Sequence, residues 1–332
     1  MNHNKMTALV LKDYSVKAFT KMDLEIPVPA AGEVLVKIAA SGVNPIDYKI
    51  REGSATYATP ELPAVLGTDM AGVVIAVGDN VSNFSVGDEV YGLTGGVRGL
   101  QGSLAQYAAV DADLIARKPA NLSMREAAAL PLVFLTAWEG LVDRAGVKAG
   151  DKVFVQGGSG GVGHMVIQLA RIFGADVWAS GSAEKQEMIA SFGATPINYR
   201  EKNVDECVSE YTAGKGFDII YDTVGGATLS ASLSAVKHYG HITSCYAFGE
   251  FNIAPSSLRC ATLSAVFVLL PMLSGEGRAH HGDILRTLTG YVEAGKIRPI
   301  VDPRRFSLDT ALEAHNAQEN GSALIKIVID IE

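Results

Sequence analysis

The chain has 332 residues, a formal net charge of −8 at pH 7 and a sequence pI of about 5.4. With 48% hydrophobic and 19% charged residues it has the composition of a globular protein, and it is long enough for two ordinary domains. The acidic balance, without a basic run or a basic helical face, argues against nucleic acid and anionic membrane surfaces as partners.

Cysteine usage and apolar runs point to a cytoplasmic protein. Cys207, Cys245 and Cys260 are too few and too scattered for a disulfide framework or a paired-cysteine metal site. The N-terminus lacks the apolar core of a signal peptide. The longest unbroken apolar run, residues 265–272, is far below the roughly 20 residues that span a bilayer. We therefore expect a protein of the cytoplasm without a membrane partner.

The pattern of the chain changes twice, which predicts a discontinuous domain with a second domain inserted. Residues 1–125 predict a β-rich domain, with strands near 8–11, 34–38 and 71–77. Residues 126–264 alternate strands and helices, which predicts right-handed βαβ crossovers and a parallel sheet. We expect residues 265–332 to rejoin the first domain. The segments expected in the last two parts are strands 152–156, 176–180, 217–222, 241–245 and 323–331, and helices 161–173, 184–192, 203–211, 227–238 and 282–294.

A glycine cluster follows the expected strand 152–156. Gly158, Gly160 and Gly163 have the G-x-G-x-x-G spacing of dinucleotide-binding turns, with a strand before them and a helix after them. In such turns the first glycine permits the tight turn, the second lets the backbone approach a pyrophosphate, and the third allows close helix packing. The alternative is a purely structural turn. The turn residues expected to bind the cofactor are Gly158, Ser159, Gly160, Gly161, Val162 and Gly163.

Five collinear segments together carry a family resemblance. They are Gly-Val-Asn-Pro-Ile-Asp (42–47), Leu-Gly-Thr-Asp-Met-Ala-Gly (66–72), Val-Gly-Asp-Glu-Val-Tyr-Gly (86–92), Gly-Ser-Leu-Ala-Gln-Tyr (102–107) and the glycine cluster. In this order they resemble the medium-chain dehydrogenase/reductase superfamily, in its zinc-free quinone oxidoreductase branch, which is ζ-crystallin-like. The resemblance implies an α/β fold, with a doubly wound parallel Rossmann sheet inserted in a β-rich GroES-like catalytic domain. It also implies NADPH-dependent hydride transfer to an activated double bond or a quinone, by a homodimer or homotetramer.

The segment after the second expected strand of the parallel sheet favours NADPH over NADH. NAD-specific sites place an acidic residue about 20 residues after the first glycine, where it binds the ribose 2′-OH. Here Ser180 and Ser182 occupy this region and Lys185 follows, whereas Asp176 lies at the other end of the strand. A lysine cation and serine hydroxyls suit a 2′-phosphate. The alternative is a solvated Lys185 and a helix-capping Ser182.

Two further cofactor contacts follow from the resemblance alone. Tyr199, in Ile-Asn-Tyr-Arg, matches a residue that lines the 2′-phosphate pocket in family members. Thr136, in Leu-Thr-Ala-Trp, matches a threonine on the nicotinamide side. A threonine in the middle of a helix is equally often only a packing residue.

The sequence predicts no metal. Zinc-dependent relatives use a cysteine and a histidine as ligands where this chain has Asn44 and Thr68, which do not suit zinc. The structural zinc lobe is also missing, since residues 91–105 contain no cysteine. Alcohol oxidation without a Lewis acid lacks a means to stabilise an alkoxide. Reduction of a conjugated carbonyl needs only hydrogen-bond donors for the enolate oxygen and a proton source.

Candidate donors lie at Asn44, Tyr48, Lys49 and Tyr57. Asn44 and Tyr57 match pocket residues of the family, whereas quinone reductases often have tyrosine where Lys49 stands. That departure favours a short enone or enal. The alternatives are half-buried packing for the two tyrosines and a turn role for Asn44 before Pro45.

The sequence therefore predicts an NADPH-dependent, metal-independent reductase of a small apolar quinone or α,β-unsaturated carbonyl compound. The apolar segment 263–273 favours such a substrate over a highly charged one. One alternative is an enoyl-thioester reductase, which needs a basic patch for a coenzyme A phosphate. Another is a non-catalytic NADPH-binding protein with a structural or regulatory role.

Overall fold

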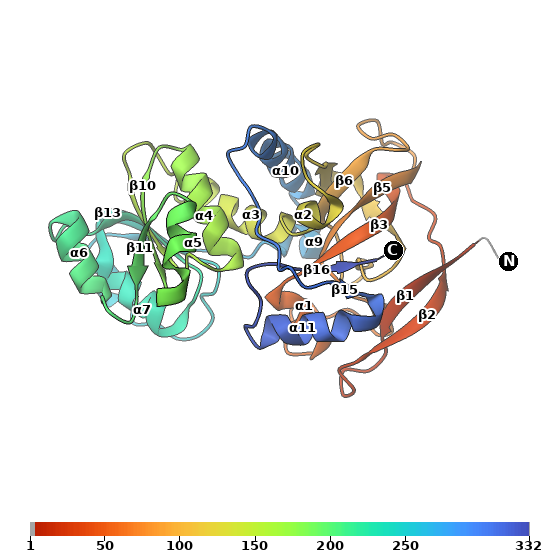
Figure 1. Cartoon of the computed structure of the whole chain (residues 1–332), viewed down its shortest axis with the longest axis horizontal. Coiled ribbons are helices and arrows are strands. Elements are labelled where there is room, and N and C mark those ends of the chain that lie inside the picture. The colour runs from red at the N-terminus through yellow and green to blue at the C-terminus, as the bar shows by residue number, and fades with distance from the viewer. Residues whose placement is uncertain (1–3, 332) are drawn as a thin grey trace. The chain divides into compact units, whose positions relative to one another are not determined.

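The computed structural model describes residues 4–331 and divides the chain into two compact units (Figure 1). The terminal unit comprises Met1–Leu132 and Leu269–Glu332, and the inserted unit comprises Val133–Val268. Helix α3 (Pro131–Trp138) contains the first boundary between them. The sequence placed that boundary at residue 125. Residues 126–132 belong to the terminal unit, in which the Leu132 N–H donates to Asp69 Oδ1 at 2.9 Å.

The terminal unit is built on a seven-stranded sheet whose centre is the long strand β3 (Glu33–Val43). The order along this sheet is β15, β16, β3, β5, β6 and β8, and β7 also pairs with β3. A second sheet has the order β2, β1 and β4. The other strands are β1 (Lys5–Leu11), β2 (Phe19–Glu25), β4 (Ala64–Val65), β5 (Asp69–Val77), β6 (Glu89–Leu93), β7 (Tyr107–Asp111), β8 (Ile115–Arg117), β15 (Phe306–Ser307) and β16 (Ile327–Asp330).

Short helices join and flank these strands. α1 (Pro45–Arg51) begins directly after β3, where Pro45 provides a preset φ at the first helical position. The Asp47 carboxylate accepts the Asn44 N–H at 2.7 Å, which satisfies one backbone donor at the helix start. The remaining helices of this unit are α2 (Met124–Ala128), α9 (Leu270–Ser274), α10 (Arg278–Glu293) and α11 (Ala311–Glu319), with 3₁₀ turns at Ala112–Leu114 and Leu308–Thr310.

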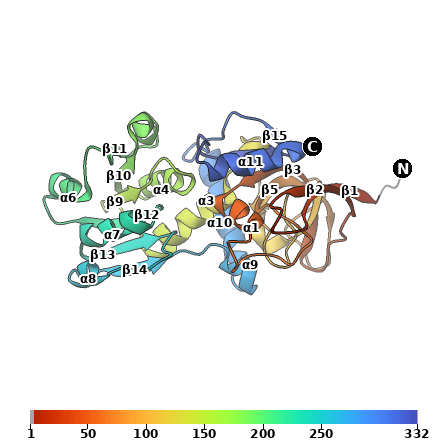
Figure 2. The ribbon, with the colours of Figure 1, turned by 90° about the horizontal axis from the view of Figure 1, so that it is seen from below.

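The inserted unit is a doubly wound parallel sheet. Within the described residues its six strands run in the order β11, β10, β9, β12, β13 and β14, which can be followed in Figure 2. Every neighbouring pair is parallel, as the predicted βαβ crossovers require. The fold class expected from the sequence is confirmed. The strands are β9 (Lys152–Gln156), β10 (Asp176–Gly181), β11 (Thr195–Asn198), β12 (Phe217–Asp222), β13 (Val236–Ser244) and β14 (Thr262–Ala265).

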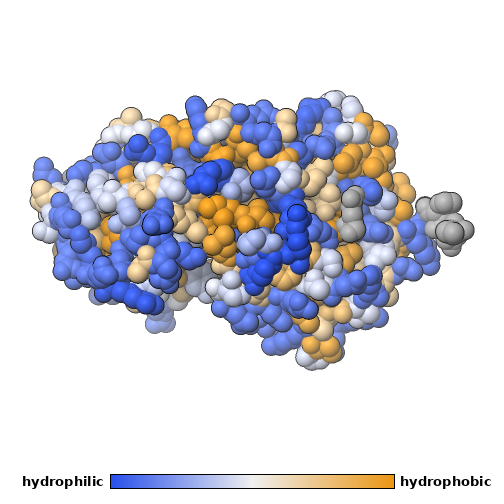
Figure 3. Space-filling view, viewed as in Figure 1, coloured by the Kyte–Doolittle hydropathy of each residue, from blue (hydrophilic) through white to orange (hydrophobic). Residues whose placement is uncertain are grey.

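Helices cover this sheet and leave charged side chains exposed. They are α4 (Gly161–Ile172), α5 (Gln186–Ser191), α6 (Val204–Thr212), α7 (Gly226–Ala235) and α8 (Ala254–Ser257), with a π-helix at Glu139–Arg144 and a 3₁₀ turn at Ala183–Lys185. Asp205, Glu206 and Glu210 are exposed on α6, and hydrophilic side chains predominate over this part of the surface in Figure 3. In residues 4–331 no helix is both long enough and apolar enough to cross a membrane.

The core of the inserted unit explains which predicted elements formed. Phe154 of β9 stacks on Phe217 of β12, with ring centroids 4.9 Å apart, in a cluster of buried apolar residues. Strands 152–156 and 217–222 therefore form as expected. β13 begins earlier than expected, at Val236, because that buried residue pairs with Phe217, so helix α7 ends at Ala235. The short strand β11 is an element that the sequence pattern did not predict.

The glycine turn between β9 and α4 packs too closely for side chains at several of its positions, and at residue 163 the obstacle is backbone. A Cβ at residue 163 would overlap the carbonyl oxygen of Gly157 and lie 2.9 Å from Gly158 Cα. At Gly160 the nearest atom, again the Gly157 oxygen, is 3.4 Å away, which is an ordinary contact. The third glycine of the motif is thus required by packing, whereas the second is not.

We predict that Gly163→Ala destabilises the inserted unit by roughly 1–3 kcal/mol, because backbone atoms must move to admit the methyl group. Gly160→Ala should leave the melting temperature nearly unchanged, since its methyl group finds space. Differential scanning calorimetry of both variants measures this difference. Equal destabilisation by the two substitutions would contradict the packing argument.

Candidate functional site

The inserted unit has a cavity of about 790 Å³ at the carboxyl ends of β9 and β10. In open parallel sheets ligands bind at this edge, where the strand order reverses. Five of the residues predicted to bind the cofactor line it, namely Ser159, Ser180, Ser182, Lys185 and Tyr199. Further lining residues that the sequence analysis did not select include Gln156, Gly157, Lys202, Asn203, Asp205, Val224 and Thr228.

The glycine turn carries backbone groups to this cavity. Gly157 has a φ of +78°, a conformation that favours glycine, and its carbonyl accepts the Gly160 N–H at 3.1 Å. Helix α4 then begins at Gly161 with Gly160 as its N-cap residue. Gly160 has no side chain that could cover the helix N-terminus. An anion can therefore approach the first N–H groups of α4.

The carboxyl end of β10 presents hydroxyl groups and no carboxylate. Ser180 is buried, and its hydroxyl donates to Gln156 Oε1 at 2.8 Å and accepts the Gly157 N–H at 3.0 Å. Ser182 lies two residues further along. Glu184 follows in the next turn. Its carboxylate accepts hydrogen bonds from the Glu184 backbone N–H and from the Ser182 hydroxyl, and both bonds lower the pKa of Glu184. Gln156 was missed by the sequence analysis, although its place directly before the glycine cluster could have indicated it.

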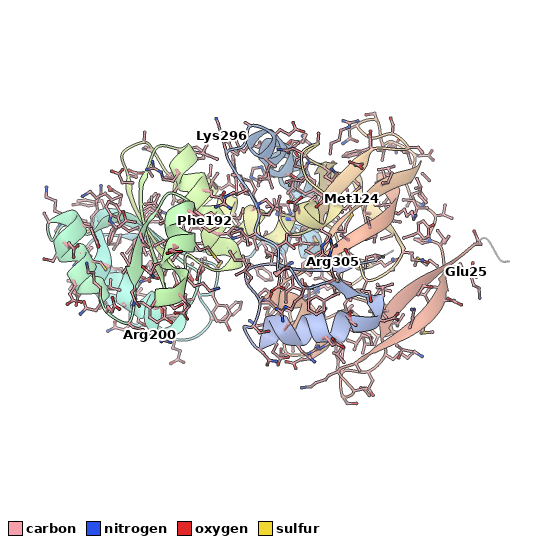
Figure 4. All side chains as sticks on the ribbon, in the orientation of Figure 1. Glu25, Met124, Phe192, Arg200, Lys296 and Arg305 are labelled. Carbon is pink, nitrogen blue, oxygen red and sulfur yellow. The ribbon has the colours of Figure 1, made fainter. Side chains whose placement is uncertain are left out.

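Three cationic side chains, those of Lys185, Arg200 and Lys202, follow the carboxyl end of β10 in the chain, and Lys185 and Lys202 line the cavity. Lys185 ends the 3₁₀ turn Ala183–Lys185 and is half-buried. Arg200, labelled in Figure 4, has its guanidinium carbon 5.9 Å from the ring of Tyr199, which is itself exposed. Lys202 binds the Glu210 carboxylate and the Tyr211 hydroxyl, and these bonds raise its pKa. The region therefore suits a phosphate dianion better than a neutral ribose hydroxyl.

The structure places Thr136 apart from the lining of this cavity. Thr136 is buried in α3, and its carbonyl accepts a hydrogen bond of 2.6 Å from the Tyr221 hydroxyl. Gly158, Gly160, Gly161, Val162 and Gly163 form the turn itself and the start of α4.

A second polar cluster lies inside the terminal unit, around Asn44. The register of the sheet pairs Gly42 with Asp69 on one side of β3, and Val43 with Ile327 on the other. The residues next to these pairs, Asn44, Thr68 and Lys326, consequently meet at one end of β3. All three are buried, as are Asp47 and Asp69.

Hydrogen bonds use every polar atom of the Asn44 side chain. Its amide nitrogen donates to Asp69 Oδ2 at 2.8 Å and to Thr68 Oγ1 at 3.2 Å, and its amide oxygen accepts from the Lys326 ammonium. Thr68 in turn donates to Asp47 Oδ2 at 3.3 Å. Asp47, Asp69 and Lys326 were missed by the sequence analysis. Nothing in the local sequence links Lys326 to Asn44, because 282 positions separate them.

This buried cluster contains two carboxyl groups and one ammonium group. Desolvation raises the pKa of Asp47 to about 7, with the neighbouring Asp69 adding to the shift. Desolvation also raises the pKa of Asp69, to about 6, against the opposing effect of Lys326. Burial lowers the pKa of Lys326. Asp47 Oδ1 is buried without a hydrogen-bond partner among the described residues, so a proton on Asp47 relieves an uncompensated charge.

Asn44 and Thr68 do not offer a zinc ion suitable ligands. Zinc prefers thiolate, imidazole and carboxylate ligands. Asn44 and Thr68, which stand at the ligand positions of zinc-dependent relatives, hydrogen-bond to each other, and the Lys326 cation already contacts the Asn44 oxygen. Across residues 4–331, no group of three or more His, Cys, Asp or Glu side chains could hold a metal.

The three other predicted donors lie on α1 and just beyond it. Tyr48 and Lys49 are adjacent on the helix and half-buried. Tyr57 is also half-buried, and its carbonyl accepts hydrogen bonds from the Arg98 guanidinium at 3.2 and 3.3 Å. In contrast with Asn44, these three side chains reach the surface of the terminal unit.

We predict that Asp47→Asn removes a pH-dependent loss of stability in the terminal unit. The folded state binds the Asp47 proton more strongly than the unfolded state, whose carboxyl titrates near 4. Raising the pH from about 4 to about 7 therefore reduces the free energy of unfolding, on the order of a few kcal/mol for this group. Denaturant titrations between pH 5 and 8 should show a flatter profile for the variant than for the wild type.

Asp302→Asn is the matched control for this prediction. A hydrogen bond from Arg304 lowers the pKa of Asp302, so this carboxyl stays ionised from pH 5 to 8. Its replacement should lower stability by the same amount throughout that range. A profile for Asp47→Asn parallel to the wild type would show that Asp47 is ionised when buried.

Comparisons with known proteins agree with the sequence motifs. Residues 30–120 match the family model described as alcohol dehydrogenase GroES-like domain, and residues 192–329 match that described as zinc-binding dehydrogenase. A solved structure of an alcohol dehydrogenase superfamily protein from Novosphingobium aromaticivorans is 50% identical, with a TM-score of 0.96. The match covers 98% of this chain and all of that one.

Three curated relatives are oxidoreductases. The 2-methylene-furan-3-one reductase of Solanum lycopersicum is 37% identical, and the match covers 98% of this chain and 79% of that protein. The chloroplastic NADPH-dependent alkenal/one oxidoreductase of Arabidopsis thaliana is 35% identical, with the same two coverages. The quinone oxidoreductase of Homo sapiens is 33% identical over 91% of this chain and 90% of its own length.

Proposed function

Given that the chain belongs to the medium-chain dehydrogenase/reductase superfamily, we propose that it reduces an α,β-unsaturated carbonyl compound or a quinone with NADPH. The observation that carries the proposal is the cavity at the ends of β9 and β10, where a glycine turn meets serines and Lys185 and no carboxylate ends β10. The relatives named for enone, alkenal and quinone reduction support the same chemistry.

The residues of the inserted unit fit a phosphorylated dinucleotide. The backbone of the glycine turn and the start of α4 bind the diphosphate, and Lys185 with Ser182 and Tyr199 binds the 2′-phosphate. NADPH bound there supplies the hydride. A lysine is suited to the 2′-phosphate because its ammonium can approach several phosphate oxygens as a mobile point charge.

In the terminal unit, Tyr48, Lys49 and Tyr57 are the proposed donors to the carbonyl oxygen of the substrate. Hydride addition to the β-carbon places negative charge on that oxygen, and a positioned donor stabilises it. A proton from solvent or from a tyrosine then completes the reduction at the α-carbon. Asn44 has no polar atom left for the substrate, so it acts by fixing the start of α1, on which Tyr48 and Lys49 stand.

Further proposals concern the metal and the assembly. The amide, hydroxyl and ammonium groups around Asn44 support a reaction without zinc. The edge strand β14 exposes Thr262, Leu263 and Ala265, and β13 is its neighbour in the sheet. An unpaired strand edge is a template for pairing with another chain. A second copy of this chain is the proposed partner there, as in a homodimer.

The direct test of the function is NADPH oxidation with a panel of 2-enones, 2-enals, quinones and enoyl thioesters. We expect turnover with short enones or enals, and with quinones at a lower kcat/KM. Binding of NADPH without turnover of any of these compounds would show a non-catalytic protein. Turnover restricted to enoyl thioesters would assign the protein to a different reaction.

We predict that Lys185→Ala weakens NADPH binding roughly ten- to a hundredfold, because a charged hydrogen bond is worth about 1.5–3 kcal/mol. NADH binding should change little. Lys202→Ala is the control, since Lys202 lines the same cavity while bound to Glu210 and Tyr211. Fluorescence titration of both cofactors measures the effect. Equal losses of NADPH and NADH affinity in Lys185→Ala would show that Lys185 does not bind the 2′-phosphate.

Exhaustive chelation should leave both the activity and the melting temperature unchanged, because no cluster of metal-ligating side chains within residues 4–331 couples a metal to folding. Elemental analysis of the purified protein before and after dialysis against a chelator provides the control. Stoichiometric zinc together with chelator-sensitive turnover would contradict the proposal.

We predict that Lys49→Ala slows hydride transfer to an enone more than Tyr57→Phe or Tyr48→Phe. Loss of an essential donor costs about 10²–10³ in rate, whereas solvent can replace a proton source and keeps the loss below about tenfold. Single-turnover measurements with deuterated NADPH isolate this step. A hundredfold slowing in either tyrosine variant, with Lys49→Ala at the wild-type rate, would identify a tyrosine as the essential donor.

A further inference from the structure

The two serines at the end of β10 have different surroundings although both line the cavity. Ser180 is 5% exposed and bonded to the β9 end of the glycine turn, whereas Ser182 is half-exposed beside Glu184. The sequence predicted both as contacts to the phosphate. Their hydrogen bonds assign them to different tasks.

A serine hydroxyl has one proton to donate. The Ser180 proton goes to Gln156 Oε1 at 2.8 Å, and one of its lone pairs accepts the Gly157 N–H at 3.0 Å. A phosphate dianion can only accept hydrogen bonds. Ser180 in this arrangement has no proton left for a phosphate.

Hydrogen bonds to β10 and to the residue after β12 fix Gln156, Gly157 and Gly158 at the start of the turn. The Ser180 carbonyl accepts the Gly158 N–H at 2.8 Å, so Ser180 binds two successive N–H groups of the turn. On the other side, the backbone carbonyl of Gln156 accepts a hydrogen bond of 2.7 Å from the Thr223 hydroxyl. A Cβ at Gly157 would lie 2.5 Å from the oxygen of that hydroxyl. Gly157 is thereby fixed between β10 and the end of β12.

Gln156 is buried at the end of β9 with 4% exposure. Its amide nitrogen is buried without a hydrogen-bond partner in the part of the chain that the structure describes. Burial of an unpaired nitrogen costs stability. The hydrogen bond of this side chain to Ser180 is made by its amide oxygen. The amide oxygen thus serves to orient the Ser180 hydroxyl toward the Gly157 N–H.

We propose that Ser180 and Gln156 are positioning residues, which hold Gly157 and the turn in the shape that receives the diphosphate. The inference rests on the proposed function, because it concerns the same dinucleotide cavity. It removes Ser180 from the set of groups that recognise the 2′-phosphate. Specificity for NADPH then depends on Lys185, Tyr199 and Ser182. The Ser182 hydroxyl donates to the exposed Glu184 carboxylate, and because Ser182 is half-exposed its proton can turn to a phosphate instead, which the buried Ser180 hydroxyl cannot do.

Two fragments of the cofactor separate the tasks. ADP has the diphosphate without a 2′-phosphate, and 2′-AMP has the 2′-phosphate without a diphosphate. In Ser180→Ala we expect ADP, NADH and NADPH to bind roughly two- to tenfold more weakly, by one common factor, because one neutral hydrogen bond supports the turn. Binding of 2′-AMP should equal that of the wild type. Isothermal titration calorimetry measures all four ligands.

Ser182→Ala is the matched control, and we expect it to weaken NADPH and 2′-AMP while sparing ADP. Ser180→Thr retains the hydroxyl and should restore most of the ADP affinity, which a purely structural loss of packing would not do. Gln156→Met removes the amide oxygen at similar length, and we expect it to weaken ADP as Ser180→Ala does.

Loss of 2′-AMP and NADPH affinity in Ser180→Ala, with ADP and NADH unchanged, would overturn the inference and make Ser180 a phosphate ligand. ADP affinity equal to the wild type in both Ser180→Ala and Gln156→Met would also overturn it. A wild-type protein that binds none of the four ligands would overturn the proposed function as well. The two failures are therefore distinguishable by the wild-type titration alone.

Discussion

The close approach of helix α4 to the glycine turn is the constraint on which the cavity at the ends of β9 and β10 depends. The Gly157 carbonyl lies where a side chain at residue 163 would stand, and it accepts the Gly160 N–H. The turn can be this tight because Gly157 provides the positive φ, and because Gly157, Gly158 and Gly163 have no side chain where neighbouring atoms approach closely. The N–H groups of Gly157, Gly158 and Gly160 are used inside the turn, so the first N–H groups of α4 are the ones left for an anion at this end of the sheet.

Local patterns in the sequence predicted the inserted unit well because its elements are local. The strands 152–156 and 217–222 and the helix after the glycine turn each need only a short stretch of chain with the right period. The start of β13 was missed because Val236 is drawn into the sheet by its pairing with Phe217, which a helical pattern does not reveal. Tertiary pairing there overrides the local preference.

The sequence could predict those properties of the candidate site that depend on which residue types are present. The absence of an acid at the end of β10 and the presence of Lys185 could be read directly from the sequence. The partner of the Ser180 hydroxyl could not, because the choice between Gln156 and a phosphate depends on the distance between two strands. In the same way, Asn44 was a reasonable candidate donor until Asp69, Thr68 and Lys326 were found to occupy its amide.

The pairing of β3 with β16 has a consequence for the order in which the protein can form during synthesis. β16 and Lys326 are made after the whole parallel sheet, whose last strand ends at residue 265. The parallel sheet can thus fold on the ribosome while the Asn44 amide oxygen still lacks its ammonium partner. A truncated chain ending before β16 would contain every strand of the parallel sheet, but the Asn44 amide would lack Lys326 and the terminal unit would be incomplete, which exposes such a chain to proteolysis.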